Sequence, residues 1–168
     1  MVNLIHLTSM TQSLSTQYQN ASNISARISL HRDYSTNPEG WFPWLFKQLR
    51  LKSGMKILEL GAGNGALWSQ NIDKVPDRVS VVLSDISQGI LADAKKAMGD
   101  HPQFEYRVFD AQAIPFDNDS FDLVIANHML FYCDDIPQTL KAVSRVLKHG
   151  GALIAAHILS TTCTKSLI

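Results

Sequence analysis

The sequence predicts an α/β fold built on a mostly parallel sheet, with about five strands present and helices at the N-terminal end. Short apolar runs alternate with helical patterns, the apolar runs are continuous, and the first of them ends in a cluster of glycines. Continuous apolar strands are typical of a parallel sheet that is covered on both faces. Strand–helix alternation implies right-handed crossovers and a doubly wound arrangement.

The predicted strands are runs of four to six residues, and all but the third are rich in aliphatic side chains. They cover residues 56–60, 79–84, 105–109, 123–126 and 152–156. Helical periodicity lies between and before these runs. Helices are predicted over 41–49, from residue 67 onward, from Ser87 (a suitable cap) to Met98, and from Pro137 to Leu147, where Gly150 and Gly151 end the last one.

The composition is that of a globular protein, with 168 residues, 45% hydrophobic and 18% charged. This length corresponds to about one domain and is enough to bury a core. Lys+Arg and Asp+Glu both number 15, so the formal net charge is zero. Because a protein that grips phosphate backbones carries a basic field, the balance argues against a nucleic-acid partner.

Cysteine, histidine and hydropathy patterns exclude several other classes. Cys133 and Cys163 form no C-x-x-C pair and are predicted to be reduced structural thiols. The six histidines lack ligand spacing, so no metal site is predicted. No run reaches the roughly 18 apolar residues that span a bilayer, and the first ten residues do not read as a signal peptide. We therefore expect a cytoplasmic protein with no membrane association.

The most informative segment is ILELGAGNGA, residues 57–66, where Gly61, Gly63 and Gly65 directly follow a predicted strand. Glycines allow a sharp turn and let a ligand touch bare backbone. In an open parallel sheet, ligands bind just outside the carboxyl ends of the strands, and this loop lies at such an end. The loop is therefore predicted to bind a ligand.

Asp85 ends the second predicted strand, 24 residues after Gly61. An acidic side chain about 20 residues beyond such a loop is placed to accept hydrogen bonds from a ribose diol. Together, the loop and Asp85 predict nucleoside binding; the alternative is an ordinary tight turn and a solvated aspartate. The same loop also fits the dinucleotide fingerprint, so the pattern by itself leaves a nicotinamide cofactor open.

Four motifs in order resemble the class I S-adenosylmethionine-dependent methyltransferases, of the broad small-molecule type that includes the ubiquinone/menaquinone methyltransferases. Residues 59–65 (ELGAGNG) resemble the family's E/D-x-G-x-G-x-G signature, and residues 83–87 (LSDIS) its second-strand acid segment. Residues 109–124 resemble the D-A-x-x-L-P-F…S-F-D-x-V stretch. Residues 143–151 resemble the R-V-L-K-P-G-G turn, with His149 in the usual proline position. Nicotinamide enzymes lack the last three motifs, which favours a methyltransferase over an oxidoreductase.

The resemblance implies a Rossmann-like fold and S-adenosylmethionine as the cofactor, and it assigns roles to the glycine loop. Gly61, Ala62 and Gly63 would pass under the methionine part and the sugar. Glu59 would help to hold the loop and the amino-acid moiety. For each of these residues the alternative is a structural role.

The remaining roles implied by the resemblance concern the nucleoside and the reacting end. Asp85 would take the ribose hydroxyls, with Ile86 against the adenine. Asp110 would accept from the adenine amino group while Ala111 offers its backbone amide. Asn127 would face the methionine end and the sulfonium. Structural roles are again the alternative.

No catalytic residue can be named from these motifs. Methyl transfer from a sulfonium mainly requires alignment and exclusion of water, and a general base is needed only if the acceptor must lose a proton. Enzymes that methylate exocyclic base amines or glutamine amides carry N-P-P-Y-like residues where residues 127–132 read NHMLFY. A small-molecule acceptor is therefore favoured. His128 and Tyr132 could touch it, although structural roles are the favoured interpretation.

Three segments are predicted along the chain. Residues 1–23, rich in Ser, Thr, Gln and Asn, are expected to form an N-terminal arm. Residues 24–52 are expected to form a helical lid or cap, as in the resembling families, although Trp41 and Trp44 could equally pack on the sheet. Residues 53–168 are expected to form the S-adenosylmethionine-binding Rossmann-like domain.

The resembling family has a sheet of seven strands, and the residues after 158 are too few for the last ones. We therefore expect a domain that lacks its last strands and exposes a sheet edge. Such an edge invites pairing with another chain, which predicts a homodimer or, as the alternative, a rearrangement that protects the edge. The alternative to an active enzyme is a truncated cofactor-binding or interaction module without methyltransferase activity.

Overall fold

A computed structural model of the chain describes residues 39–156. The expected N-terminal arm, residues 1–23, lies outside the described residues, as does the part of the expected lid before residue 39 and Cys163. No helix in the described part of the chain is long and apolar enough to cross a membrane.

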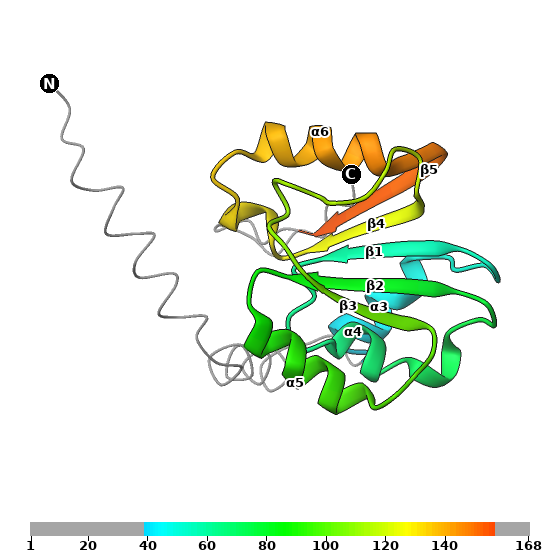
Figure 1. Cartoon of the computed structure of the whole chain (residues 1–168). Helices are drawn as coiled ribbons and strands as arrows, with labels where there is room; N and C mark the ends of the chain where they lie inside the picture. Colours follow the sequence, from blue (N-terminus) through cyan, green and yellow to red (C-terminus); the bar gives the residue numbers. More distant parts are fainter. Residues whose placement is uncertain (1–38, 157–168) are drawn as a thin grey trace, which may run out of the picture.

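The fold is centred on one sheet of five parallel strands in the order β3-β2-β1-β4-β5 (Figure 1). The strands are β1 (Lys56–Leu60), β2 (Ser80–Asp85), β3 (Phe104–Val108), β4 (Phe121–Asn127) and β5 (Leu147–Ala156). The predicted α/β class and parallel sheet are confirmed. The chain runs outward from β1 to β3 and then returns to the other side of β1 as β4, so the strand order reverses between β1 and β4.

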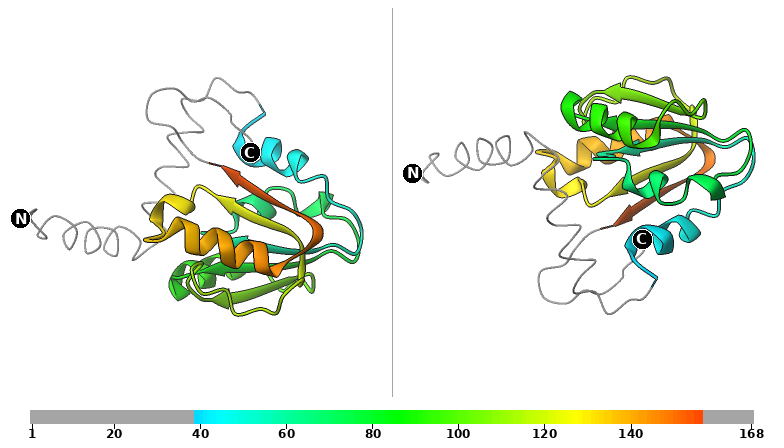
Figure 2. Two further views of the ribbon diagram at one scale, coloured as in Figure 1. Left: turned by 90° about the horizontal axis from the view of Figure 1, so that it is seen from above. Right: turned by 90° about the horizontal axis from the view of Figure 1, so that it is seen from below.

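Helices cover both faces of the sheet (Figures 1 and 2). One face packs against α3 (Trp41–Gln48), α4 (Ala66–Ser69) and α5 (Gln88–Met98), and the other against α6 (Ile136–Val146). Two short 3₁₀ helices, η1 (Ile72–Lys74) and η2 (Leu130–Tyr132), complete the regular structure of the described residues.

Side chains of β1 alternate between two cores because successive residues of a strand point to opposite faces. Ile57 belongs to the core beneath α3, α4 and α5, whereas Leu58 and Leu60 belong to the core beneath α6. All three are fully buried. The continuous apolar pattern of this strand therefore has the cause that the sequence predicted, which is burial on both faces.

The start of α5 follows the predicted capping chemistry, and α6 starts one residue before the predicted Pro137, with Asp135 as its cap. The Ser87 side chain accepts a hydrogen bond from the Ile90 N–H at 3.4 Å and caps α5. At the start of α6, Asp135 accepts from the Gln138 N–H at 2.8 Å, and Pro137 lies in the first turn. A proline is tolerated there because its missing N–H would have no partner within the helix.

The predicted boundary between the last helix and the last strand is wrong, since the strand predicted over 152–156 begins five residues earlier. The helix predicted to run to Leu147 and to end at Gly150 and Gly151 stops one residue earlier, and β5 begins at once with Leu147. Phe121 of β4 pairs with Leu147 of β5, and Leu123 of β4 pairs with Ala152 of β5. β5 therefore advances five residues where β4 advances two, and β5 bulges there. Gly150 permits the bulge because it has φ +79°. The glycines that were interpreted as a helix stop therefore shape a strand.

Asp122, near the start of β4, ties together the amino ends of three strands. Its carboxylate accepts the Lys56 N–H of β1 at 2.7 Å and the Lys148 ammonium of β5 at 2.9 Å. Partial burial alone would raise the pKa of this carboxyl, but the hydrogen bonds from Lys148 and Lys56 hold the pKa below its ordinary value.

Asp122→Asn is expected to lower the free energy of unfolding by about 1–2 kcal/mol at pH 7, since bonds to charged groups at partly exposed sites fall in this range. A carboxyl whose folded pKa is lowered stabilises above its unfolded pKa and loses this effect as the pH falls through the folded pKa. The difference from the parent should therefore shrink between pH 5 and pH 3 in urea titrations. Asp117→Asn, on an exposed loop, is the control. A loss that is the same at both pH values would contradict the assignment.

Candidate cofactor-binding site

The glycine loop leaves the carboxyl end of β1 and is fastened to the end of β2. The Ala62 N–H donates to the Ser84 carbonyl at 2.8 Å, and the Ser84 hydroxyl donates to the Glu59 carbonyl at 2.8 Å. These bonds hold the loop at the edge of the sheet where an open α/β fold binds its ligand.

The three glycines are all left-handed, with φ of +62°, +57° and +70°, but each has a different reason. A Cβ on Gly61 would lie 2.6 Å from the Met129 Cβ, and one on Gly65 would lie 3.2 Å from the Met98 sulfur. A Cβ on Gly63 would meet nothing within 4 Å. A side chain at Gly61 would collide with Met129 and one at Gly65 would crowd Met98, whereas the space beside Gly63 is open.

Asp85 is directed toward the loop by backbone hydrogen bonds. Its Oδ2 accepts the Gly63 N–H at 3.1 Å and its Oδ1 accepts the Ser87 N–H at 3.0 Å. Burial raises the pKa of Asp85, while the N–H groups of Ser87 and Gly63 oppose the shift. A carboxylate can accept about four hydrogen bonds in total, so Asp85 keeps acceptor capacity that a ribose hydroxyl could use.

Glu59 lies beneath the loop and is 2% exposed. Its Oε2 accepts the indole N–H of Trp68 at 2.6 Å. Burial raises the pKa of Glu59 to about 8; the Trp68 hydrogen bond lowers it and the nearby Asp85 carboxylate raises it further. Sequence reasoning missed Trp68, since a tryptophan at the start of a helix shows no pattern that links it to an acid nine residues earlier.

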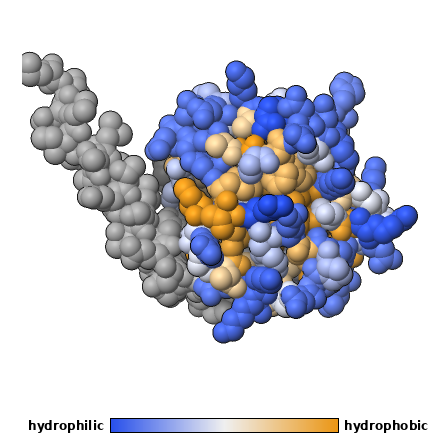
Figure 3. Space-filling model, in the orientation of Figure 1, coloured by the Kyte–Doolittle hydropathy of each residue, from blue (hydrophilic) through white to orange (hydrophobic). Residues whose placement is uncertain are grey.

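Apolar side chains flank Asp85 at the carboxyl edge of the sheet. Ile86 is 71% exposed and Val108, which pairs with Asp85 in the β2–β3 register, is 53% exposed. On the face drawn in Figure 3, hydrophobic residues also reach the surface between hydrophilic ones. Exposed aliphatic residues beside an oriented carboxylate suit the flat, apolar face of a base. Val108 was not predicted, because it reads as an ordinary buried strand residue.

Asp110, just after β3, is held near Asp85 through the backbone, since the Phe109 N–H donates to the Asp85 carbonyl at 3.3 Å. The Asp110 carboxylate accepts the backbone N–H of Gln112 at 2.8 Å and the side-chain amide of Gln112 at 3.2 Å. Gln112 in turn accepts the Asp135 N–H at 2.8 Å. Asp110 and its neighbour Ala111 are therefore held in place by contacts that reach α6.

Asn127 ends β4 and is bound to α3. Its Oδ1 accepts the indole N–H of Trp41 at 3.2 Å. The Trp41 ring lies 5.0 Å from the His128 ring and 5.4 Å from Trp44. His128 has φ +55°, unusual for a residue other than glycine, and its N–H donates to the Ala156 carbonyl at 3.0 Å. The start of α3 thus adjoins the carboxyl end of β4.

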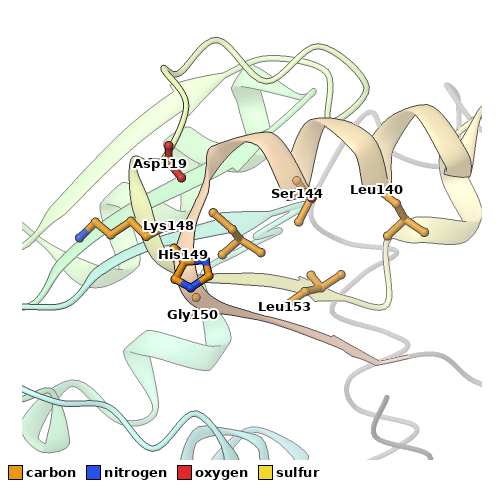
Figure 4. A pocket seen from close by; sticks show the side chains of 10 residues that line it. Asp119, Leu140, Ser144, Lys148, His149, Gly150 and Leu153 are labelled. Atoms are coloured by element: carbon orange, nitrogen blue, oxygen red, sulfur yellow. The ribbon is translucent and has the colours of Figure 1, made fainter.

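The structure brings eight of the nine predicted residues to the ends of β1, β2 and β3, and places the ninth, Asn127, across β1 at the end of β4. A separate hollow lies between α6 and β5, where Lys148, His149 and Leu153 line it (Figure 4). None of the nine predicted residues contributes to that hollow.

With this geometry in place, comparison with known proteins identifies the family. The family described as methyltransferase domain matches residues 58–155, more than half of the chain. The chain belongs to the methyltransferase domain family. The resemblance to class I S-adenosylmethionine-dependent methyltransferases is confirmed, and the alternative of a nicotinamide-dependent oxidoreductase gives way to it.

Curated relatives are similar over this region. The ubiquinone/menaquinone biosynthesis C-methyltransferase UbiE of Shewanella oneidensis is 30% identical over 117 residues, which cover 68% of this chain and 47% of that protein. The highly reducing polyketide synthase verA of Penicillium polonicum is 34% identical over 114 residues, which cover 64% of this chain and 4% of that protein. The chain thus spans about half of the bacterial enzyme and a small part of the synthase.

Solved structures share the fold. A Haloferax volcanii methyltransferase, in complex with the Trm112 methyltransferase activator, has a TM-score of 0.63 and 26% identity, covering 77% of this chain and 55% of that chain. The trans-methyltransferase CalH, in complex with SAH, has a TM-score of 0.57 and 29% identity, covering 68% of this chain and 35% of that chain.

Gly61→Ala should destabilise the fold more than Gly63→Ala. Both variants place a Cβ in the left-handed region, at a cost of about 1–2 kcal/mol, but the Cβ of the first also collides with Met129, which adds about 1–3 kcal/mol. Urea denaturation measures the two free energies. Gly99→Ala, with φ +68° and open space around the added Cβ, is the strain-only control. Equal losses for Gly61→Ala and Gly99→Ala would show that Met129 does not restrict the loop.

Proposed function

We propose that this chain binds S-adenosylmethionine and transfers its methyl group to a small-molecule acceptor. The observation that carries the proposal is the hydrogen bond from the Gly63 N–H to Asp85, because it joins the open glycine of the loop to the acid at the end of β2. This arrangement is suited to a ribose beside a backbone that carries no Cβ.

The similar proteins support both parts of the proposal. The trans-methyltransferase CalH is described in complex with SAH, which supports an S-adenosyl ligand at the matching site. Relatives named for ubiquinone/menaquinone biosynthesis and for polyketide synthesis support a small-molecule acceptor. The sequence after β4, which lacks N-P-P-Y-like residues, agrees with this class of acceptor.

Under this proposal, four residues that follow or end β2 and β3 bind the nucleoside. Asp85 accepts from the ribose hydroxyls, and Ile86 lies against the adenine. Asp110 accepts from the adenine amino group, and Ala111 offers its N–H. The support for these roles is the exposure of Ile86 and the hydrogen bonds that fix the two carboxylates.

Under the same proposal, residues of the loop and of β4 contact the methionine end of the cofactor. Gly61 and Ala62 form the floor, Glu59 holds the amino-acid moiety, and Asn127 faces the sulfonium. S-adenosylmethionine, when bound, supplies a methyl carbon that is already activated. What the protein contributes is alignment and exclusion of water, so no general base is assigned.

We also propose that residues 53–168 act as the cofactor-binding domain and that residues 24–52 contribute a lid. The hydrogen bond between Trp41 and Asn127 supports the lid, since it brings α3 to the end of β4. The second candidate function is a binding module that holds the cofactor and transfers nothing. Methylation of any acceptor in a screen of small molecules would decide between the two.

Asp85→Ala should weaken the binding of S-adenosylhomocysteine at least tenfold, because one hydrogen bond to a charged group contributes about 1.5–3 kcal/mol. Calorimetric titration of the parent and the variant measures the effect. Asp93→Ala, an exposed aspartate on α5, should bind like the parent. Failure of the parent to bind, or equal binding by the Asp85 variant, would contradict the proposed site.

A homodimer paired along β5 is proposed as the assembly. Within the described sheet β5 is an edge strand of ten residues that pairs only with β4, and such edges invite pairing. Light scattering coupled to gel filtration should give the mass of a dimer for the parent. Ala152→Lys should shift the mass toward that of the monomer, because Ala152 is exposed and a charged side chain on an edge strand disfavours pairing with another strand. Glu105→Lys on the opposite edge strand, β3, should not shift it. A monomer mass for the parent at every concentration would contradict this assembly.

A further inference from the structure

Glu59 and Trp68 form a buried pair that the proposed nucleoside contacts do not explain. The Trp68 side chain is fully buried, and its indole N–H meets the Glu59 carboxyl at 2.6 Å. Edge-on contacts with Phe46 and Phe104, at centroid distances of 6.1 and 5.5 Å, fix the indole ring. These contacts orient the indole N–H toward the carboxyl.

The surroundings of Glu59 provide no compensating positive charge in the described residues. Its neighbours in strand register are Leu83 on β2 and Ile125 on β4, and α4 contributes Trp68. The charged group that acts on it is the carboxylate of Asp85. The charged side chains of the helices on this face are all exposed: Lys47, Asp93, Lys95 and Lys96.

These surroundings favour a neutral carboxyl in the protein without its ligand. An ionised carboxylate that is 2% exposed, beside a second carboxylate and with one neutral donor, is poorly stabilised. The raised pKa of Glu59, about 8, agrees with this view and has burial as its main cause. A cation placed beside Glu59 would reverse the preference, because an opposite charge within a few ångströms favours the ionised form.

We propose that Glu59 holds a proton in the unliganded protein and loses it when the ammonium-bearing methionine moiety binds, with Trp68 as the positioning residue for the resulting carboxylate. The O–H bond of Glu59 breaks, its electron pair stays on the carboxylate, and the proton passes to the solvent. This inference rests on the proposed function, in which Glu59 holds the amino-acid moiety. Cofactor binding would then be coupled to the release of one proton.

The sign of the pH effect follows from this coupling. Below pH 8 the free protein binds one proton more than the complex, so binding tightens as the pH rises. For one released proton, the dissociation constant falls about tenfold per pH unit. The effect levels off above the pKa of the unliganded protein.

Calorimetric titration with S-adenosylhomocysteine at pH 6 and pH 7.5, in two buffers of different ionisation enthalpy, counts the protons. The parent should release close to one, and Glu59→Gln, which keeps an acceptor for Trp68, should release none. Trp68→Phe keeps an aromatic side chain but removes the N–H donor. The pKa of Glu59 therefore rises, and binding at pH 7.5 weakens while a proton is still released. Equal numbers of protons released by the parent and by Glu59→Gln, including none, would overturn the proposal, since Glu59 would then not be the source of a proton.

A measurement without ligand separates this inference from the proposed function. A carboxyl whose folded pKa is raised contributes stability that is fully present below its unfolded pKa and is lost as the pH rises through the folded value. Glu59→Gln should therefore gain in unfolding temperature relative to the parent between pH 5 and pH 8. A difference in unfolding temperature between Glu59→Gln and the parent that does not change with pH would refute the buried proton. If the difference grows but S-adenosylhomocysteine does not bind, the proposed function fails, and the coupling fails with it.

Discussion

The hydrogen bond from the Gly63 N–H to the Asp85 carboxylate links the carboxyl ends of β1 and β2, where the predicted site lies. It depends on the left-handed backbone of Gly63, which turns the N–H toward β2, and on the parallel pairing of β1 with β2, which brings Asp85 level with the loop. The Ala62–Ser84 bond reinforces the same junction. If this junction loosened, neither Asp85 nor the floor of the loop would keep its position.

The reversal of strand order explains why the predicted site has two sides. Because β2 and β3 lie on one side of β1 and β4 lies on the other, Asp85 and Asp110 end up opposite Asn127. The two sides are held by different means. Backbone hydrogen bonds and Gln112 fix the acids, whereas an indole from α3 fixes the amide of Asn127. The side toward β4 therefore depends on a helix that precedes the sheet in the chain.

The sequence was sufficient for the strands, the parallel pairing and the position of the glycine loop, since apolar runs and glycine spacing are local signals. It failed where an interaction joins distant segments. Trp68 and Gln112 show no local pattern, yet each fixes a predicted acid. Gly150 misled for a related reason, because a left-handed glycine serves a strand bulge as well as a helix end. Periodicity alone cannot distinguish the two uses.

The central pairing of β1 with β4 also has a consequence for how the chain folds. The chain passes from β1 through β2 to β3 with one crossover between successive strands, and from β4 to β5 through η2 and α6, whereas the Lys56–Asp122 hydrogen bond spans 66 residues. Closing so long a loop is entropically unfavourable and slow. We therefore expect the two halves to gather local structure early and to dock late. The predicted site, which takes residues from both halves, would then be complete only after this docking step.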